Sequence, residues 1–194
     1  MKNNISIKDE FLRKSIHLSN SGIAFLLFFW KQESVLAFIF IVTMLMIGLD
    51  LVRIYNSNIN KIYHSFLGGI TREFEKNRLT GASYVMLASL IVLLFFDKYT
   101  CIAALLIMSY SDTAAALIGR LYGKTQIFDK TLEGSFAFFT VSFLIILLLY
   151  PEIDFLFSFI AIIVATLVEL FSLFKIDDNL SVPVVAAIII SLGG

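Results

Sequence analysis

The sequence contains little charge and a single cysteine, and both shortages exclude classes of protein. With only Cys101, the chain cannot form an internal disulfide and is not a disulfide-stabilised scaffold. Charged residues make up 15% of the 194 residues, compared with roughly 25% in soluble domains. Basic and acidic residues number 15 each, so no net positive charge favours binding to nucleic acid.

Apolar residues dominate instead, at 59% of the chain with 20 phenylalanines, and the mean hydropathy is +0.90. A soluble domain of this size cannot hide so much apolar surface, which excludes a soluble enzyme and a disordered chain. The apolar runs are continuous rather than alternating, so they predict helices and not strands. We therefore expect residues 1–194 to form one all-α integral membrane domain, a polytopic bundle of transmembrane helices.

Seven segments are predicted to span the membrane, because each offers most of the roughly 20 apolar residues that a membrane-crossing helix needs. They are 15–31, 34–53, 81–97, 99–118, 134–151, 153–174 and 181–194, of which the first and the last are short or sparse in apolar residues. The first ends in Phe28-Phe29-Trp30-Lys31, which is no small-residue cleavage site. We therefore expect this segment to remain as a span rather than to be removed as a signal peptide.

The loops between these segments predict an orientation. Thirteen of the 15 Lys and Arg residues fall on the side of the N-terminus, and the positive-inside rule makes that side cytoplasmic. Residues 1–14 then form a cytoplasmic N-terminal segment, and 54–79 the longest cytoplasmic connection. Within 54–79, Ile59, Ile62 and Phe66 recur at helical spacing and predict a helix in the membrane interface. A solvated loop with apolar anchors is the alternative.

Asp112 and Glu169 are acidic residues inside predicted spans, where an unpaired charge costs at least about 2.5–3.5 kcal/mol. Each requires a cation, a metal ion or a proton. Ala115, Ala116 and Gly119 form a small-residue face beside Asp112, which permits the close approach of a helix or a ligand. We expect this face to border the access route of a lipid. A purely structural Asp–Arg pair is the alternative for Asp112.

Other polar clusters lie at the cytoplasmic ends of the predicted spans. Arg13, Lys14 and His17 share one helix face that can hold a phosphate group, although ordinary positive-inside anchoring produces the same pattern. Thr80 and Gly81 open the third span, and the free N–H groups of a helix start attract anions. Both clusters are therefore candidate phosphate sites.

A further cluster, Lys130 to Ser135, has the composition of a polyphosphate-binding loop without being a Walker motif. Lys130 supplies a positive charge, Gly134 exposes backbone amides, and Glu133 can hold a divalent cation. Asp178 and Asn179, before the last span, fit a magnesium site better than mutual stabilisation with the other acidic residues.

Together these groups predict one charged site at the cytoplasmic surface of the membrane. Its carboxylates, which we expect to bind Mg²⁺, are Asp112, Glu133, Glu169 and Asp178. Carboxylate-bound Mg²⁺ among Lys and Arg side chains is typical of nucleotide-dependent phosphoryl transfer, and a membrane-embedded fold indicates a lipid as the second substrate. The alternatives are a small membrane transporter, which requires paired polar groups at mid-depth, and a structural adaptor, which has no need of buried acidic residues.

The motifs resemble those of the dolichol kinase, phytol kinase and CTP-dependent diacylglycerol kinase family. The matching pieces, in family order, are Arg13-Lys14-x-x-His17, Leu79-Thr80-Gly81-Ala82-Ser83-Tyr84, Asp112-Thr113-Ala114-Ala115 through Gly119-Arg120-x-Tyr122-Gly123-Lys124, Lys130-Thr131-Leu132-Glu133-Gly134-Ser135, and Glu169 with Asp178-Asn179-Leu180-x-x-Pro183. The resemblance implies CTP as phosphoryl donor, a divalent cation, and polyprenol, phytol or diacylglycerol as acceptor. The sequence departs from the family at Ser111, where glycine is usual. The short chain resembles a minimal prokaryotic version in the cell membrane, with its active site facing the cytoplasm.

With that resemblance, each motif residue receives an expected role. The expected nucleotide-binding residues are Arg13, Lys14, Thr80, Gly81, Arg120, Lys124, Lys130, Gly134, Ser135 and Asn179. The expected catalytic residues are Asp112, Lys130, Glu133 and His17, with Asp112 as the first candidate to accept the hydroxyl proton and His17 as the second. The Asp112 and Lys130-to-Gly134 regions also resemble the phosphatidate cytidylyltransferases, which use CTP and Mg²⁺ to join CMP to phosphatidate. These enzymes are the main alternative.

Overall fold

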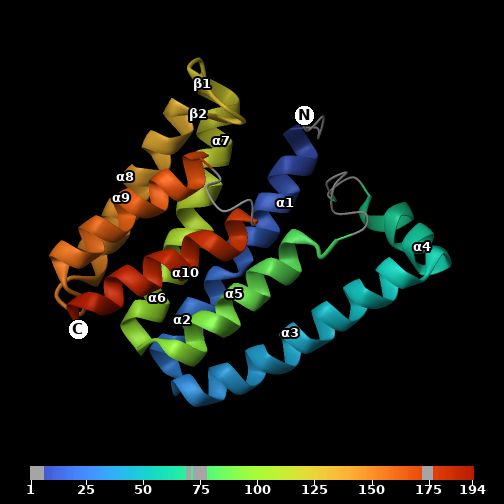
Figure 1. Ribbon diagram of the computed structural model, residues 1–194, viewed down its shortest axis with the longest axis horizontal. Coiled ribbons are helices and arrows are strands. Elements are labelled where there is room, and N and C mark those ends of the chain that lie inside the picture. The colour runs from blue at the N-terminus through green and yellow to red at the C-terminus, as the bar shows by residue number, and fades with distance from the viewer. Residues whose placement is uncertain (1–6, 69–70, 72–77, 172–176) are drawn as a thin grey trace.

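The computed structural model describes residues 7–68, 71, 78–171 and 177–194, with the backbone alone for 7–10 and 67. Most of these residues lie in helices, which confirms the all-α prediction (Figure 1). The elements are α1 (Ile7–Ser19), α2 (Ser21–Phe29), α3 (Gln32–Tyr55), α4 (Ser57–Leu67), α5 (Gly81–Phe95), α6 (Lys98–Leu106), the π-helical turn η2 (Ile107–Ser111), α7 (Asp112–Tyr122), β1 (Gln126–Ile127), β2 (Lys130–Thr131), α8 (Leu132–Leu149), α9 (Phe155–Phe171), α10 (Asp178–Ile190) and the 3₁₀ turn η3 (Ser191–Gly193).

A continuous helical rod, made of α6, η2 and α7, runs through the bundle (Figure 1). The helices α2, α5, α8 and α10 pack against this rod. The remaining long helices form an outer shell, since α9 packs on α8 and α10, and α3 packs on α5. The helix α1 begins at the end of the bundle that carries the β1–β2 hairpin, and the C-terminus lies at the opposite end (Figure 1).

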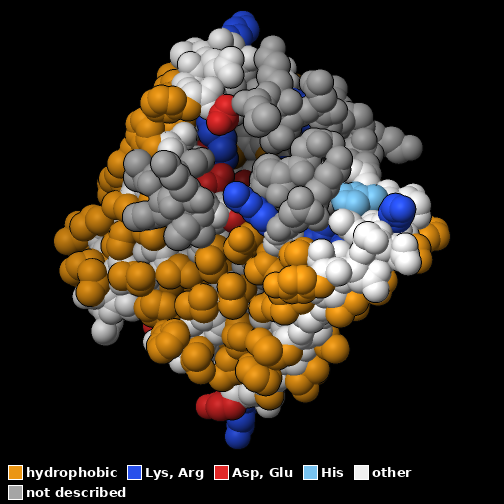
Figure 2. Space-filling model, turned by 45° about the vertical axis from the view of Figure 1, so that its right-hand side comes forward, with side chains coloured by type: hydrophobic (Ala, Val, Ile, Leu, Met, Phe, Trp, Pro, Cys, Tyr) orange, Lys and Arg blue, Asp and Glu red, His pale blue; other side chains and the backbone are white. Residues whose placement is uncertain are grey.

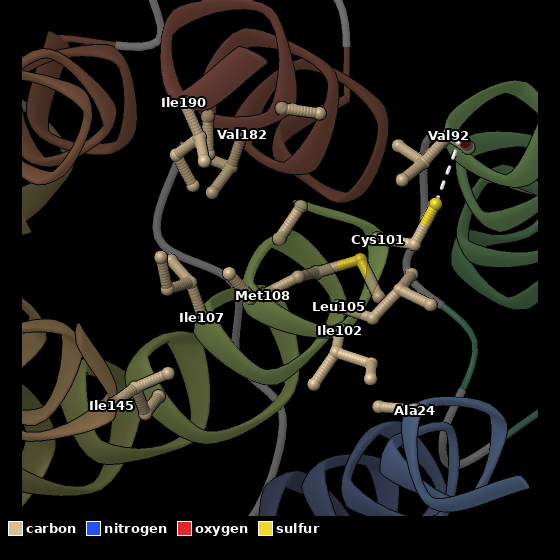
Figure 3. Packing of buried hydrophobic residues seen from close by; sticks show 14 of the residues in the cluster. Ala24, Val92, Cys101, Ile102, Leu105, Ile107, Met108, Ile145, Val182 and Ile190 are labelled. Atoms are coloured by element: carbon tan, nitrogen blue, oxygen red, sulfur yellow. Dashed lines mark hydrogen bonds between the residues drawn. The ribbon is translucent and has the colours of Figure 1, made fainter. Parts of the chain in front are cut away.

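The core is built around the buried side chains of the rod. Ile102, Leu105 and Met108 lie between α2 and α10 and are at most 1% exposed (Figure 3). Cys101 is also buried, and its thiol donates to the carbonyl oxygen of Val92 on α5 at 3.2 Å. A helix that is apolar on every face is typical of the interior of a bundle, which explains why this segment lies at the centre.

The outer surface carries many large apolar side chains, and Figure 2 shows them over a broad region below a recess where charged side chains gather. Among the described residues, three helical stretches are long and apolar enough to cross a membrane: Gln32–Tyr55, Lys98–Tyr122 and Leu132–Leu149. Gly81–Phe95, Phe155–Phe171 and Asp178–Gly193 are apolar but shorter. The chain is therefore a membrane protein, while the number of seven spans and the cytoplasmic N-terminus stay predictions.

The N-terminal part and the loop before α8 differ in detail from the sequence-based expectations. The predicted first span, 15–31, is divided between two helices, since α1 ends at Ser19 and α2 begins at Ser21. A short antiparallel hairpin of β1 and β2 precedes α8, although the sequence favours no strand. Two-residue strands are too short to produce a recognisable alternation of apolar and polar residues.

The predicted connection 54–79 contains the helix α4. Its residues Ile59, Ile62 and Phe66 are exposed, as an amphipathic helix in the membrane interface requires. The interfacial location itself stays a prediction. Positions 69–70 and 72–77 of this connection, like 1–6 of the predicted N-terminal segment, lie outside the described residues.

The small residues of α7 pack this helix against α8. A Cβ atom on Gly119 would lie 2.7 Å from Oγ1 of Thr131, and one on Gly134 would lie 2.8 Å from the carbonyl oxygen of Ala115. Only glycine allows the two backbones to approach so closely. The expectation that this face borders a lipid's access route is therefore wrong where α8 covers it.

We expect Gly134→Ala to lower the free energy of unfolding by about 1–3 kcal/mol, because the added methyl group meets backbone atoms that have little room to move. Gly48→Ala on α3 is the matched control, since no atom lies within 4 Å of the Cβ position there. Alanine at 48 should leave the stability unchanged or higher. Thermal unfolding of both purified variants in one detergent measures the difference, and equal midpoints for Gly134→Ala and the parent chain would contradict the packing.

Candidate functional site

Ionisable side chains from helices far apart in the sequence meet near the hairpin end of the bundle. They are Lys14 and His17 of α1, Asp112 of α7, Lys130 of β2, Glu169 of α9 and Asp178 of α10. We refer to these residues as the charged cluster. Figure 2 shows charged side chains of both signs together in a recess above the hydrophobic surface.

Asp112 begins α7, directly after the π-helical turn η2. Such turns are frequent at functional sites. The Asp112 carboxylate forms an ion pair with Lys14, which is 4% exposed, and Nδ1 of His17 lies 3.6 Å from the same carboxylate oxygen. Lys14 therefore compensates the charge of Asp112. From the sequence, an arginine is the alternative partner in this structural role, whereas the structure shows a lysine.

Ser111, which stands where glycine is usual in the resembled family, has a partner on α8. Its hydroxyl accepts a hydrogen bond from the hydroxyl of Ser142 at 2.8 Å, and both residues are fully buried. The backbone of Ser111 keeps helical angles, with φ −71° and ψ −41°. The serine is thus accommodated without distortion of the backbone beside Asp112, because its buried hydroxyl is hydrogen-bonded.

Lys130 bridges two carboxylates. Its Nζ donates to Oε1 of Glu169 at 2.7 Å and to Oδ2 of Asp178 at 2.9 Å, and Ser135 donates to Oε2 of Glu169 at 3.4 Å. Burial disfavours the charged form of Lys130, but the carboxylates of Glu169, Asp178 and Asp112 outweigh this effect and raise its pKa above the ordinary value. Lys130 therefore carries a persistent positive charge, and Asp112 lies close enough to interact with it.

The hairpin before α8 positions Lys130. The strands pair with Ile127 opposite Lys130, and Phe128 in the turn has φ 53°, in the left-handed region that bulky residues rarely adopt. Thr131 then caps α8, since its side chain accepts a hydrogen bond from the N–H of Gly134 at 3.2 Å. The amide that we expected to bind a phosphate at Gly134 is therefore used within the fold.

Glu133 contacts the loop that follows α7. Its carboxylate accepts a hydrogen bond from the backbone N–H of Thr125 at 3.1 Å, which ties the loop after α7 to the start of α8. Arg120 and Lys124 are exposed, in the last turn of α7 and in the loop that follows. The structure thus uses the Glu133 carboxylate to hold this loop, and it leaves Arg120 and Lys124 on the surface near the end of α7.

A buried ion pair that the motifs do not reveal holds the start of α5. Oδ2 of Asp50 accepts hydrogen bonds from the N–H of Thr80 at 2.7 Å, from its hydroxyl at 3.0 Å and from the hydroxyl of Ser83 at 2.7 Å. Arg53 donates to Oδ1 of Asp50 at 3.1 Å. An internal anion thus occupies the helix start where Thr80 is expected to bind a nucleotide. The i, i+3 spacing of Asp50 and Arg53 at the end of an apolar run is the one sequence signal for this pair.

A cavity of about 330 Å³ adjoins the charged cluster. Its walls come mainly from α1, α2, α3 and α5 and are mostly apolar. Four of the expected nucleotide-binding residues, Arg13, Thr80, Gly81 and Asn179, line it, and so does His17. His17 therefore belongs to both features, and the cavity meets the charged cluster at this side chain.

Comparisons with known proteins agree with these observations. The chain is 34% identical over 179 residues to an uncharacterised protein of Rickettsia prowazekii, covering 88% of each chain. It is 31% identical over 166 residues to CTP-dependent diacylglycerol kinase 1 of Saccharomyces cerevisiae, covering 72% of this chain but only 57% of that protein, and 27% identical over 160 residues to the protein of that name in Schizosaccharomyces pombe, covering 74% and 73%. The chain belongs to the CTP-dependent diacylglycerol kinase family. No family model and no solved structure matches it.

Membership in this family implies a divalent cation, and the carboxylates of the charged cluster fit one mode of binding. Across residues 7–68, 71, 78–171 and 177–194, no group of three or more His, Cys, Asp or Glu side chains is placed to hold a metal ion by itself. Mg²⁺, however, is commonly bound by one or two carboxylates together with the phosphates of a substrate. Glu169 and Asp178, which share Lys130 as a partner, fit this mode.

We expect Asp50→Ala to lower the free energy of unfolding by about 3 kcal/mol or more, because the buried guanidinium of Arg53 loses its carboxylate. Glu33→Ala, in the exposed first turn of the same helix, should change it by less than about 0.5 kcal/mol. Denaturant or thermal unfolding of the two variants in detergent makes the comparison. A similar effect of both substitutions would show that the Asp50 pair does not stabilise the fold.

Proposed function

We propose that this membrane protein is a lipid kinase that transfers the γ-phosphoryl group of CTP to a membrane-embedded alcohol at the cytoplasmic face. The observation that carries the proposal is that a charged cluster and an apolar cavity meet at one side chain, His17. A triphosphate is bound by charged groups and a lipid by an apolar cavity, so a kinase that joins them needs both at one place. The relatives named CTP-dependent diacylglycerol kinase 1 support the donor and the class of acceptor.

Cations form the donor side of the proposed site. Lys130 carries a persistent positive charge, and Arg120 and Lys124 extend from the end of α7. Such side chains donate hydrogen bonds to phosphate oxygens, which orients the triphosphate and offsets its charge. Glu169 and Asp178 are the residues that would hold Mg²⁺, which when bound neutralises charge on the phosphoryl group in transfer.

His17 is the proposed proton acceptor on the other side. Asp112, the first candidate from the sequence, is paired with Lys14, whereas Nε2 of His17 has no hydrogen-bond partner among the described residues. As the hydroxyl oxygen bonds to the γ-phosphorus and the bond from that phosphorus to the bridging oxygen breaks, the hydroxyl proton passes to His17 and CDP leaves. The Asp112 carboxylate, near Nδ1, stabilises the protonated imidazole.

The proposed reaction predicts which label of CTP reaches the lipid. Purified protein is incubated with Mg²⁺ and either γ-³²P- or α-³²P-labelled CTP, with diacylglycerol, a polyprenol or phytol offered in separate reactions. A kinase transfers only the γ label, because the α phosphorus leaves with CDP. Transfer of the α label to phosphatidate would instead identify a cytidylyltransferase. Transfer of neither label to any lipid would contradict both.

Asp112→Asn is expected to slow phosphoryl transfer by about 100-fold or more, because the proposed proton acceptor loses the charge that stabilises its protonated form. Asp97→Asn is the matched control, since Asp97 caps α6 with its side chain and asparagine caps a helix equally well. The initial rate of γ-³²P incorporation is measured for both, with thermal unfolding to confirm that each is folded. An unchanged rate in folded Asp112→Asn would remove Asp112 from the mechanism.

A further inference from the structure

The cavity beside the charged cluster has apolar walls along most of its length. Ile23 of α2, Ile39 and Val42 of α3, and Val85 and Met86 of α5 line it. Its volume of about 330 Å³ lies within the range of small-molecule binding sites. The apolar part of these walls binds a hydrocarbon chain well and a nucleotide poorly, because it offers no partner to phosphate or base. Polar lining residues, among them Arg13, Thr80 and Asn179, make up the rest of the wall.

Two polar side chains on the cavity wall have buried atoms without hydrogen-bond partners among the described residues. His17 and Asn20 are 8% and 4% exposed, and both line the cavity. Among the described residues, no well-aligned hydrogen bond reaches either ring nitrogen of His17 or Oδ1 of Asn20, and Asn179 on the same wall is the amide that approaches the His17 ring. The amide nitrogen of Asn20 reaches only Oγ of Ser89, at 3.5 Å. Buried polar atoms without partners destabilise a fold, so these atoms point to a ligand that supplies the missing contacts.

The order of these groups along the chain gives the ligand a direction. His17 stands beside the Asp112 carboxylate, where the proposed phosphoryl transfer takes place. Asn20 follows three residues later, and Ile23 three residues after that. The side chains on the wall therefore change from an imidazole to an amide and then to a hydrocarbon. A ligand that matches this order has a hydroxyl group at one end, a polar group a few bonds behind it and then an apolar chain.

We propose that this cavity binds an acyl chain of a glyceride acceptor, with Asn20 hydrogen-bonded to an ester group behind the hydroxyl. The proposal deepens the proposed kinase function and rests on it for the identity of the acceptor. After rotation of its terminal group, the Asn20 amide donates an N–H to an ester carbonyl, and its Oδ1 then faces the Ser89 hydroxyl, which can donate to it. A prenyl alcohol has only hydrocarbon behind its hydroxyl. Asn20 is thus a specificity-determining residue that favours glycerides over prenyl alcohols.

Photolabelling locates the bound chain without any need for CTP. The full-length protein in phosphatidylcholine nanodiscs is irradiated with a diacylglycerol that carries a diazirine in one acyl chain, and labelled peptides are identified by mass spectrometry. We expect labels around Ile23, Val42 and Val85. Labels confined to exposed outer positions, such as Leu144 and Leu148 of α8, would overturn the proposal.

A matched pair of substitutions on α3 tests whether the cavity holds the chain. Val42→Phe fills part of the cavity, whereas Ile41→Phe adds the same ring at a neighbouring position that is 59% exposed. We expect Val42→Phe to reduce labelling of the cavity peptides at least roughly fivefold, and Ile41→Phe to leave it unchanged. Equal labelling in both variants would overturn the proposal.

Competition tests the role of Asn20. In Asn20→Leu, the concentration of unlabelled diacylglycerol that halves the labelling should rise by roughly fivefold, the loss expected for one hydrogen bond. The concentration of a prenyl alcohol that halves the labelling should stay the same or fall. A parallel rise for both competitors would show that Asn20 only supports the fold and would overturn its role in specificity.

The labelling experiment and the phosphoryl-transfer assay test the lipid site and the kinase function independently of each other. Labels in the cavity without transfer of phosphate to any lipid would support the lipid site and contradict the kinase. Transfer of the γ label to diacylglycerol with labels only outside the cavity would support the kinase and contradict the lipid site.

Discussion

The charge of Asp112 is the constraint on which the charged cluster depends. This carboxylate lies within an apolar helical rod, so it requires a cation inside the protein. Lys14 supplies the cation, and it reaches Asp112 because α1 packs against η2 and α7. The same packing brings His17 beside the carboxylate and onto the wall of the cavity. One electrostatic requirement therefore determines the position of the residue that joins the two parts of the proposed site.

Close backbone packing positions the other part of the cluster. Gly119 and Gly134 allow α7 and α8 to approach each other, and the hairpin between these helices directs Lys130 toward α9 and α10. Without Lys130, Glu169 and Asp178 would stand close together as like charges, which repel each other. The bridging cation thus stabilises a pair of carboxylates that is also suited to Mg²⁺, so the structural and the proposed functional roles of these residues depend on the same geometry.

The sequence predicts the proximity of charged residues best where a charge in or beside an apolar helix has no explanation other than a nearby partner. A charge inside or directly beside an apolar helix needs a partner, which is why Asp112, Lys130, Glu169 and Asp178 are grouped correctly. Glu133 is grouped with them by its motif, but its direction depends on a hairpin too short to show any periodicity. Asp50, which also lies inside a predicted span, is missed because it belongs to none of the recognised motifs and has Arg53 three residues away as a local partner, so its contacts with Thr80 and Ser83 leave no further sequence signal.

The proposed mechanism also explains why the proton acceptor stands at the wall of an apolar cavity. A kinase that binds CTP next to water must favour a lipid hydroxyl over water as the nucleophile. Walls such as Ile39 and Val85 hold water poorly, whereas in the proposed complex a lipid would fill the space beside His17 and present its own hydroxyl there. Because Nε2 of His17 has no well-aligned hydrogen bond among the described residues, it would be available to take the proton of that hydroxyl. In the proposed mechanism, the apolar surface that binds the acceptor therefore also disfavours the hydrolysis of CTP by water.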